Sequence, residues 1–326
     1  MMNMQEITNL SIDASTVCQL KCPECSTTKG IIKNGIIRSG FLKFNIFRDF
    51  IEKNHQIKQI ELSNWGEIFL NPEIIDIIKF CHYNGIKLTA GNGTNFNKVA
   101  DDVLEALVKY KFAYINISID GASQESYVKY RINGDYDEVI SNIKRLNYYK
   151  SKYDSQYPKL SWQFIIFGHN EHELPQIKTL CQELNMVFYP RLNHSTFSPL
   201  INKEFVREES GLNVATRDEY KAKFNKAYKR PCCQLMYSPQ VNWNGDLLGC
   251  CVNKWKSFGN AFKEGLSNCL NNDLYTQTIS VLFGKENVTE EMPCFKCPTY
   301  ADIKNNPISE EEIYEYAAFI HPAEKI

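Results

Sequence analysis

Residues 18–25 read Cys-Gln-Leu-Lys-Cys-Pro-Glu-Cys, which places three cysteines at C-x3-C-x2-C spacing. The segment before them, residues 7–13, alternates between apolar and polar residues, which is typical of a strand. Thiolates are the usual ligands of iron–sulfur clusters, and a [4Fe–4S] cluster contains four irons. Three ligands from one loop leave one iron open to a small molecule. Zinc is the alternative, but it usually takes four ligands and no fourth Cys or His lies near this loop.

The composition is that of an ordinary globular protein. The chain has 326 residues, of which 43% are hydrophobic and 23% charged, enough for a large core and two domains. Its 37 basic and 38 acidic residues nearly cancel, so charge favours neither nucleic acid nor an anionic membrane as partner. There is no signal peptide and no apolar stretch of membrane-spanning length. Twelve cysteines without an export signal favour a reducing cytoplasm and metal ligation.

Strand and helix patterns alternate up to about residue 190 and indicate βα units around a parallel sheet. Right-handed crossovers curl six such units into a partial (β/α)6 TIM-like barrel, whose chemistry lies at the carboxyl ends of the strands. The cysteine loop falls at that end of the first strand. The predicted strands are 7–13, 57–62, 86–90, 114–119, 160–167 and 187–189, with helices at 41–53, 72–83, 99–110, 123–149 (broken near 133–134) and 172–184.

The sequence pattern changes after residue 199. Residues 200–230 are polar and charged, and the chain then becomes rich in cysteine, tryptophan, glycine and asparagine. We therefore expect two domains, residues 1–210 and residues 211–326, the second small and cysteine-rich.

The cysteine loop and three strand-end segments together resemble the radical S-adenosylmethionine (SAM) superfamily. Gly66-Glu67 follows the second predicted strand and is similar to the family's Gly-Gly-Glu motif, with Trp65 where the family often has its first glycine. Residues 91–94 (Gly-Asn-Gly-Thr) and 118–121 (Ser-Ile-Asp-Gly) follow the third and fourth strands and resemble the family's T-N-G-T and S-I-D-G segments. Order, spacing and position at strand ends agree with the family over residues 7–190.

The resemblance implies how SAM would bind. Cys18, Cys22 and Cys25 would hold a [4Fe–4S] cluster, and the amino and carboxylate groups of SAM would chelate its open iron. Reductive cleavage of SAM would yield methionine and a 5′-deoxyadenosyl radical, which abstracts hydrogen from a substrate. An arginine suits the SAM carboxylate because of its fixed fork of donors. The SAM-binding residues implied are Gly66, Glu67, Asn92, Ser118, Asp120 and Arg131.

A second cysteine group lies between residues 232 and 297 and resembles the SPASM/twitch extension, which carries auxiliary iron–sulfur clusters. A two-cluster form would have further cysteines after it, and residues 298–326 contain none, so we expect one auxiliary [4Fe–4S] cluster. A structural zinc ribbon is the alternative. The predicted ligands are Cys232, Cys250, Cys294 and Cys297, while Cys233 and Cys251 are alternatives to their neighbours.

These features predict a radical SAM oxidoreductase, served by an electron donor such as flavodoxin or ferredoxin. Twitch-bearing relatives include enzymes that oxidise alcohols on sugar-like rings, so we expect a small polar, sugar-like substrate. Arg191, just after the sixth strand, is the candidate to hold or deprotonate it.

Two other functions stay open. A peptide-modifying maturase often carries a leader-peptide-binding domain, and a cluster loop that begins at Cys18 leaves no room for one ahead of it. A non-catalytic iron–sulfur or zinc protein gives no reason for polar motifs at consecutive strand ends.

Overall fold

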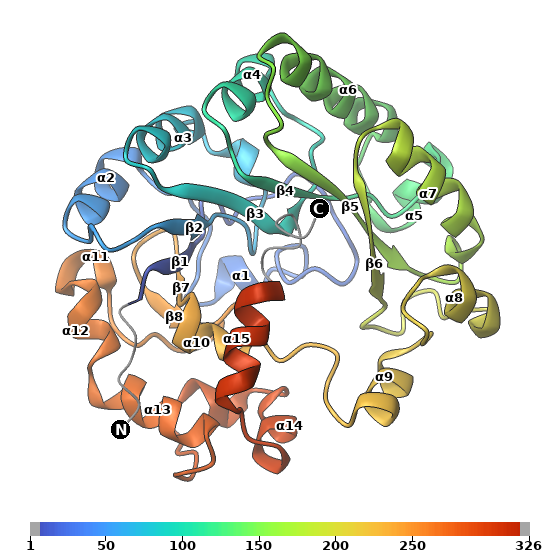
Figure 1. The fold of residues 1–326 in the computed structure, drawn as a ribbon. Helices are drawn as coiled ribbons and strands as arrows, with labels where there is room; N and C mark the ends of the chain where they lie inside the picture. Colours follow the sequence, from blue (N-terminus) through green and yellow to red (C-terminus); the bar gives the residue numbers. More distant parts are fainter. Residues whose placement is uncertain (1–6, 320–326) are drawn as a thin grey trace.

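The computed structural model describes residues 7–319, which form an eight-stranded sheet flanked by helices (Figure 1). The strand order is β6-β5-β4-β3-β2-β1-β7-β8, parallel throughout except for the β7–β8 pair. The α/β partial barrel predicted from the sequence is therefore confirmed. The strands are β1 (Asn9–Ile12), β2 (Gln59–Glu61), β3 (Lys87–Thr94), β4 (Tyr114–Ser118), β5 (Lys159–Ile166), β6 (Val187–Leu192), β7 (Gln240–Val241) and β8 (Leu247–Gly249).

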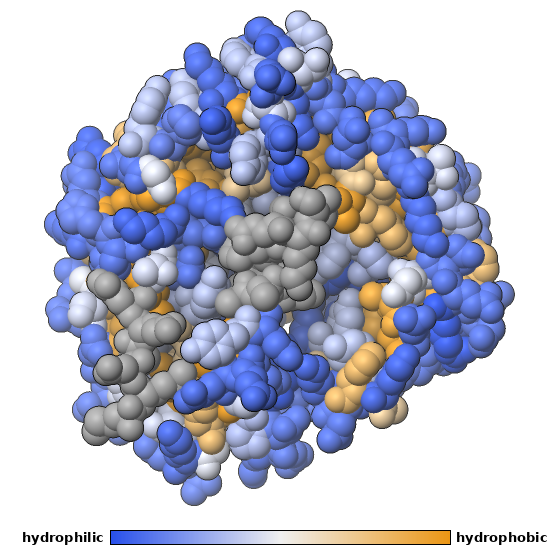
Figure 2. Space-filling model, in the orientation of Figure 1, coloured by the Kyte–Doolittle hydropathy of each residue, from blue (hydrophilic) through white to orange (hydrophobic). Residues whose placement is uncertain are grey.

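Helices cover the outer face of the curved sheet (Figure 1). They form where apolar residues recur at helical spacing, as in α2 (Phe44–Glu52), which buries Phe47, Phe50 and Ile51. The face seen in Figure 2 is hydrophilic along the rim of helices, while apolar residues gather between the helices and the sheet. The barrel helices are α1 (Ile31–Asn34), α2 (Phe44–Glu52), α3 (Ile74–Tyr83), α4 (Asp101–Lys109), α5 (Gln124–Tyr130), α6 (Tyr136–Lys152) and α7 (Leu174–Glu183), with short η1 (Ile68–Leu70) and η2 (Glu171–Glu173).

The break predicted near residues 133–134 separates α5 from α6. Asn133 adopts a left-handed backbone conformation (φ 67°), which stops the first helix. The side chain of Asp135 then accepts a hydrogen bond from Glu138 N at 3.0 Å and caps the second helix.

Residues 91–94 lie inside β3, so the prediction that this segment follows the third strand is wrong. The pairing with β4 shifts in register between Ala90 and Thr94, so the strand continues through an irregularity. Gly93 has a φ of 117°, and a Cβ there would lie 2.6 Å from Ser118 Oγ. The glycine permits both the irregular backbone and the close approach of the neighbouring strand.

The region after β6 continues the barrel sheet on its other side. β7 pairs with β1 through Ser11↔Gln240 and Ile12↔Val241, so residues from both predicted domains share one sheet. Among the described residues, no helix is both long and apolar enough to span a bilayer. The remaining helices are α8 (Lys203–Glu209), α9 (Arg217–Phe224), η3 (Pro231–Cys233), α10 (Gln234–Tyr237), α11 (Ala261–Glu264), α12 (Leu266–Leu270), α13 (Asp273–Leu282), η4 (Pro293–Lys296), α14 (Tyr300–Asn305) and α15 (Glu310–Phe319).

Candidate active site and cluster sites

The loop after β1 brings three thiols together in an apolar shell. Cys22 is buried beside Tyr130 and Phe167, and Cys18 and Cys25 contact the same cluster. Burial, then the Glu67 carboxylate, then the two other thiols raise the pKa of Cys18 to about 12. One buried and two partly buried neighbouring thiols suit a metal cluster, because bound metal stabilises the thiolate form that burial disfavours.

Arg131 lies beside this loop. Its Nη1 is 3.7 Å from Cys22 Sγ, and its Nε donates to Asp120 Oδ2 at 2.6 Å. Asp120 is fully buried, and its other oxygen accepts from Ile165 N at 2.7 Å. Both carboxylate oxygens are therefore occupied, so Asp120 positions Arg131 next to Cys22.

Gly66 lies against the chain that leads into the cysteine loop. A Cβ there would lie 2.5 Å from Ser15 O and 2.7 Å from Val17 N, so a larger residue would displace this segment. The next residue, Glu67, donates its N–H to Val17 O at 2.8 Å. The structural reason for glycine at this position is thus the close approach of two backbones.

The Glu67 side chain is buried and accepts from Asn95 N at 2.6 Å. Burial raises the pKa of Glu67 to about 7, although backbone hydrogen bonds from Asn95 and Phe69 oppose the shift. Asn95 in turn points its Nδ2 at Cys18 Sγ, 3.5 Å away. Sequence reasoning missed Asn95, although it directly follows the Gly-Asn-Gly-Thr segment.

The two other predicted SAM-binding residues, Asn92 and Ser118, form hydrogen bonds with residues outside the cysteine loop. Asn92 donates through Nδ2 to Ser63 O at 2.8 Å and lines a cavity described below. Ser118 accepts from Gln163 Nε2 at 2.9 Å. The structure therefore brings Glu67 and Arg131 to the cysteines, whereas Asn92 lines the cavity and Ser118 bonds to Gln163.

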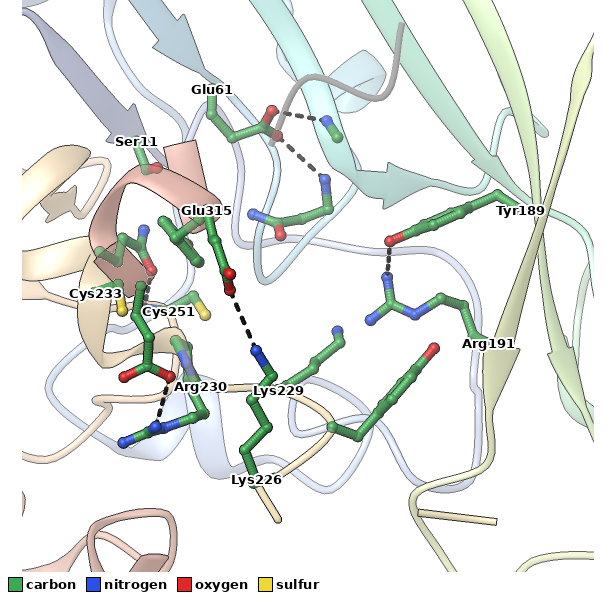
Figure 3. Close-up of a pocket in the computed structure, with 18 of the residues that line it drawn as sticks. Ser11, Glu61, Tyr189, Arg191, Lys226, Lys229, Arg230, Cys233, Cys251 and Glu315 are labelled. Atoms are coloured by element: carbon green, nitrogen blue, oxygen red, sulfur yellow. Dashed lines mark hydrogen bonds and ion pairs between the residues drawn. The ribbon is translucent and has the colours of Figure 1, made fainter. Parts of the chain in front are cut away.

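A cavity of about 290 Å³ lies between the strand ends of the barrel and the C-terminal region (Figure 3). Glu61, the last residue of β2, lines the cavity. Its carboxylate accepts hydrogen bonds from Thr89 Oγ1 at 2.6 Å and from Gly91 N at 2.7 Å. Sequence reasoning did not single out this acid, although its place at a strand end marks it. The lining residues used below are Glu61, Asn92, Tyr189, Arg191, Lys226, Tyr228, Lys229, Arg230, Cys233, Cys251, Glu312 and Glu315.

Helix α15 forms one wall of this cavity and is held by two ion pairs. Glu312 pairs with Arg230 at 2.5 Å, and Glu315 pairs with Lys226 at 3.2 Å (Figure 3). Arg191, near the end of β6, lies on the barrel side and donates to Tyr189 Oη at 2.8 Å. The substrate role predicted for Arg191 stays a prediction, and the geometry puts its guanidinium at the cavity.

The second cysteine group lies against the same cavity. Burial raises the pKa of Cys232 well above its ordinary value, and the neighbouring thiols of Cys250, Cys294, Cys297 and Cys233 add to the effect. The four predicted ligands, Cys232, Cys250, Cys294 and Cys297, match in number the four protein ligands of one cluster. Cys233 and Cys251 line the cavity.

Residues 7–319 contain no group of three or more Cys, His, Asp or Glu side chains arranged to hold a single metal ion. In a [4Fe–4S] cluster each thiolate binds a different iron, which is a different requirement. The described residues therefore form no site for a single metal ion, and this leaves the two cysteine groups free to bind clusters.

The fold and the two cysteine groups define an α/β iron–sulfur enzyme. The model of the radical SAM superfamily matches residues 12–181, and the model of the iron–sulfur cluster-binding SPASM domain matches residues 232–298. The chain belongs to the radical SAM superfamily, with SAM, a [4Fe–4S] cluster and auxiliary iron–sulfur binding as its cofactor chemistry.

Two curated relatives match in part. The chain is 27% identical over 195 residues to the probable GTP 3′,8-cyclase of Methanocaldococcus jannaschii, which covers 56% of this chain and 58% of that protein. It is 26% identical over 164 residues to the cysteine-type anaerobic sulfatase-maturating enzyme of Clostridium novyi, covering 46% and 43%. The chain thus spans about half the length of these relatives.

A solved structure shares most of the fold. SuiB of Streptococcus suis bound to S-adenosylmethionine superposes with a TM-score of 0.62 at 16% identity, over 91% of this chain and 72% of that chain. SuiB has also been solved with its precursor peptide SuiA, with the same TM-score. At this identity the likeness shows the fold alone.

Proposed function

We propose that this protein uses radical SAM chemistry to oxidise a small polar substrate held in the cavity between the barrel and the second cysteine group. The observation that supports this proposal is the position of that cavity, which reaches from Glu61 and Arg191 at the strand ends to Cys251. Its volume of about 290 Å³ is at the small end of ligand sites, roughly 300–1,000 Å³.

When bound, SAM and the two clusters supply a radical that abstracts hydrogen and an acceptor for the second electron. The protein's own residues orient and shield the reactants. Cys18, Cys22 and Cys25 would hold the first cluster, with Arg131 beside it for the SAM carboxylate. Polar groups such as Asn92 would select which substrate hydrogen lies closest, because a reactive radical is directed by proximity.

The first test is SAM cleavage. Anaerobically reconstituted protein, given dithionite and SAM, should form 5′-deoxyadenosine. Replacing Cys18, Cys22 and Cys25 together with alanine should abolish this product, while Cys81→Ala, a buried helix cysteine outside both groups, serves as the control. Unchanged product from the triple variant would refute the assignment of these ligands.

Peptide modification is the second candidate function. The similarity to a sulfatase-maturating enzyme and the fold shared with SuiB support it. Deuterium transfer into 5′-deoxyadenosine separates the two: label from deuterated polyols or cyclitols supports the small substrate, and label from deuterated peptides supports the maturase. The proposal includes a cytoplasmic location and a flavodoxin- or ferredoxin-type donor, since the cluster needs a low-potential electron.

A further inference from the structure

Arg191 is a buried cation with no acidic partner in the described residues. Arg191 is only 8% exposed. Among residues 7–319, no carboxylate forms an ion pair with it. Its hydrogen bond to Tyr189 Oη orients the guanidinium but does not neutralise it. A buried charge of this kind is ordinarily paired, so the cavity side of Arg191 is where a negative ligand group would be stabilised.

The acids that line the cavity already have partners. Glu61 accepts hydrogen bonds from Ser63, Thr89 and Gly91. Glu312 and Glu315 pair with Arg230 and Lys226. None of the three lining carboxylates is therefore available to Arg191.

The surroundings of Arg191 add positive charge. The guanidinium groups of Arg191 and Arg217 lie 6.0 and 5.1 Å from the same Tyr228 ring. Burial and then the charge of Arg191 lower the pKa of Arg217. Burial, then Arg217, and further Arg191 lower the pKa of His194, against the opposing charge of Glu24. Figure 3 shows Lys229 extending into the cavity toward Arg191. This end of the cavity therefore repels cations and attracts anions.

We infer that this end of the cavity is an oxyanion subsite, and that the substrate carries a carboxylate or phosphate group bound by Arg191. The planar fork of a guanidinium matches two oxygens of either group. The inference rests on the proposed function, because it names the substrate class for the same cavity. An anchored oxyanion would fix the substrate, so that one C–H bond faces the SAM side of the barrel.

Isothermal titration of the cluster-reconstituted protein tests the subsite, with inorganic phosphate, malonate and the neutral malonamide as probes. The wild-type protein should bind phosphate or malonate and not malonamide, and the stronger of the two identifies the group. Arg191→Gln should weaken that binding at least tenfold, and Arg191→Lys should weaken it less. Arg48→Gln, an exposed arginine on α2, is the matched control and should bind as the wild type does.

A second measurement uses only the wild-type protein, so it does not depend on whether Arg191→Gln folds. Phenylglyoxal modification of Arg191 in the wild-type protein, mapped by peptide mass spectrometry, should be slowed by the bound anion. Equal anion binding by wild type and Arg191→Gln, or no anion binding and no protection in the wild type, would overturn the inference. The titration contains neither SAM nor reductant. Failure of SAM cleavage would therefore reject the proposed function, while the anion-binding result would still decide whether the oxyanion subsite exists.

Discussion

At the scale of single residues, the ion pair of Arg131 and Asp120 governs the environment of the cysteine loop. The arginine side chain is 13% exposed and the aspartate side chain is fully buried, so solvent screens the pair weakly. The aspartate holds the guanidinium in place, and one guanidinium nitrogen remains close to Cys22. This arrangement pre-orients a cation beside Cys22.

We predict that Arg131→Ala weakens SAM binding by about 2–4 kcal/mol, the range for removing one partner of a desolvated charge pair. Binding to the reconstituted protein can be measured by equilibrium dialysis with labelled SAM. Arg145→Ala, which removes a half-buried arginine of α6 that pairs with Asp101, is the control. Wild-type affinity in Arg131→Ala, with its iron content intact, would contradict the assignment.

Asp13 gives a prediction for pH dependence. Burial raises the pKa of Asp13 to about 8 against hydrogen bonds from Trp65 and Gln240, so the folded protein holds this proton at pH values where an exposed aspartate has lost it. Between about pH 4 and pH 8 the folded state binds more protons than the unfolded state, so stability falls as pH rises. Asp13→Asn should remove this loss of stability, because asparagine does not ionise. The loss amounts to a few kcal/mol, since each unit of pKa difference between the folded and unfolded states is worth about 1.4 kcal/mol.

The measurement is chemical denaturation of the anaerobic protein at pH 6 and pH 8.5, for wild type and Asp13→Asn. The free energy of unfolding of the wild type should fall from pH 6 to pH 8.5 by more than that of Asp13→Asn. Asp76→Asn, an exposed acid on α3, is the comparison. An identical pH dependence in wild type and Asp13→Asn would show that Asp13 is ionised in the folded protein.

At the scale of elements, α15 depends on ion pairs that reach across the chain. The Arg230 side chain is 7% exposed, and it contacts both Glu312 and the backbone oxygen of Asn306. Removing one partner of such a buried pair leaves the other uncompensated, which is costly. The cavity wall formed by α15 should therefore be sensitive to this one arginine.

We predict that Arg230→Ala speeds amide hydrogen exchange in α15 at least tenfold, while exchange in α6 stays unchanged. Lys256→Ala, which removes an exposed ion pair with Glu291, should leave both helices as they are. Unaltered exchange of α15 in Arg230→Ala would mean that apolar contacts alone hold this helix.

At the scale of the whole molecule, β1 joins the two cysteine-bearing regions. The loop after β1 carries the first cysteine group, and β7, which pairs with β1, lies seven residues after Cys233. The Ser11 and Ser238 hydroxyls share a hydrogen bond of 2.9 Å, and Gln240 Nε2 donates to Asp13 at 3.0 Å. The cavity is therefore bordered by both regions on one continuous sheet.

We predict about eight irons per reconstituted chain, the sum of two four-iron clusters. Replacing Cys18, Cys22 and Cys25 with alanine should leave about half of this iron, bound by Cys232, Cys250, Cys294 and Cys297. Because the auxiliary cluster would have no open iron, SAM should not change its spectrum. A triple variant that holds stoichiometric zinc and no iron would make the C-terminal group a zinc ribbon.

Local sequence determined the order of strands and helices and the place of the first cysteine loop. Apolar periodicity marks each βα unit, and parallel strands bring all their carboxyl ends to one edge, so the loop after β1 had to lie at the reactive end. The family match and the cofactors followed from motifs at these strand ends. What the pattern misjudged was residues 91–94, because Gly and Asn are typical of turns, and only the pairing of β3 with β4 keeps this segment in the sheet.

Tertiary structure alone decided which polar side chains meet. Asp120 and Arg131 are 11 positions apart, while Asn95 reaches Cys18 across 77 positions, and no local periodicity encodes such contacts. The pairing of β7 with β1, and the pairing of the cavity's carboxylates with groups other than Arg191, likewise depend on how distant segments pack. The physical reason is that propensity and periodicity act over a few neighbouring residues, whereas burial and charge pairing are settled only when the chain closes on itself.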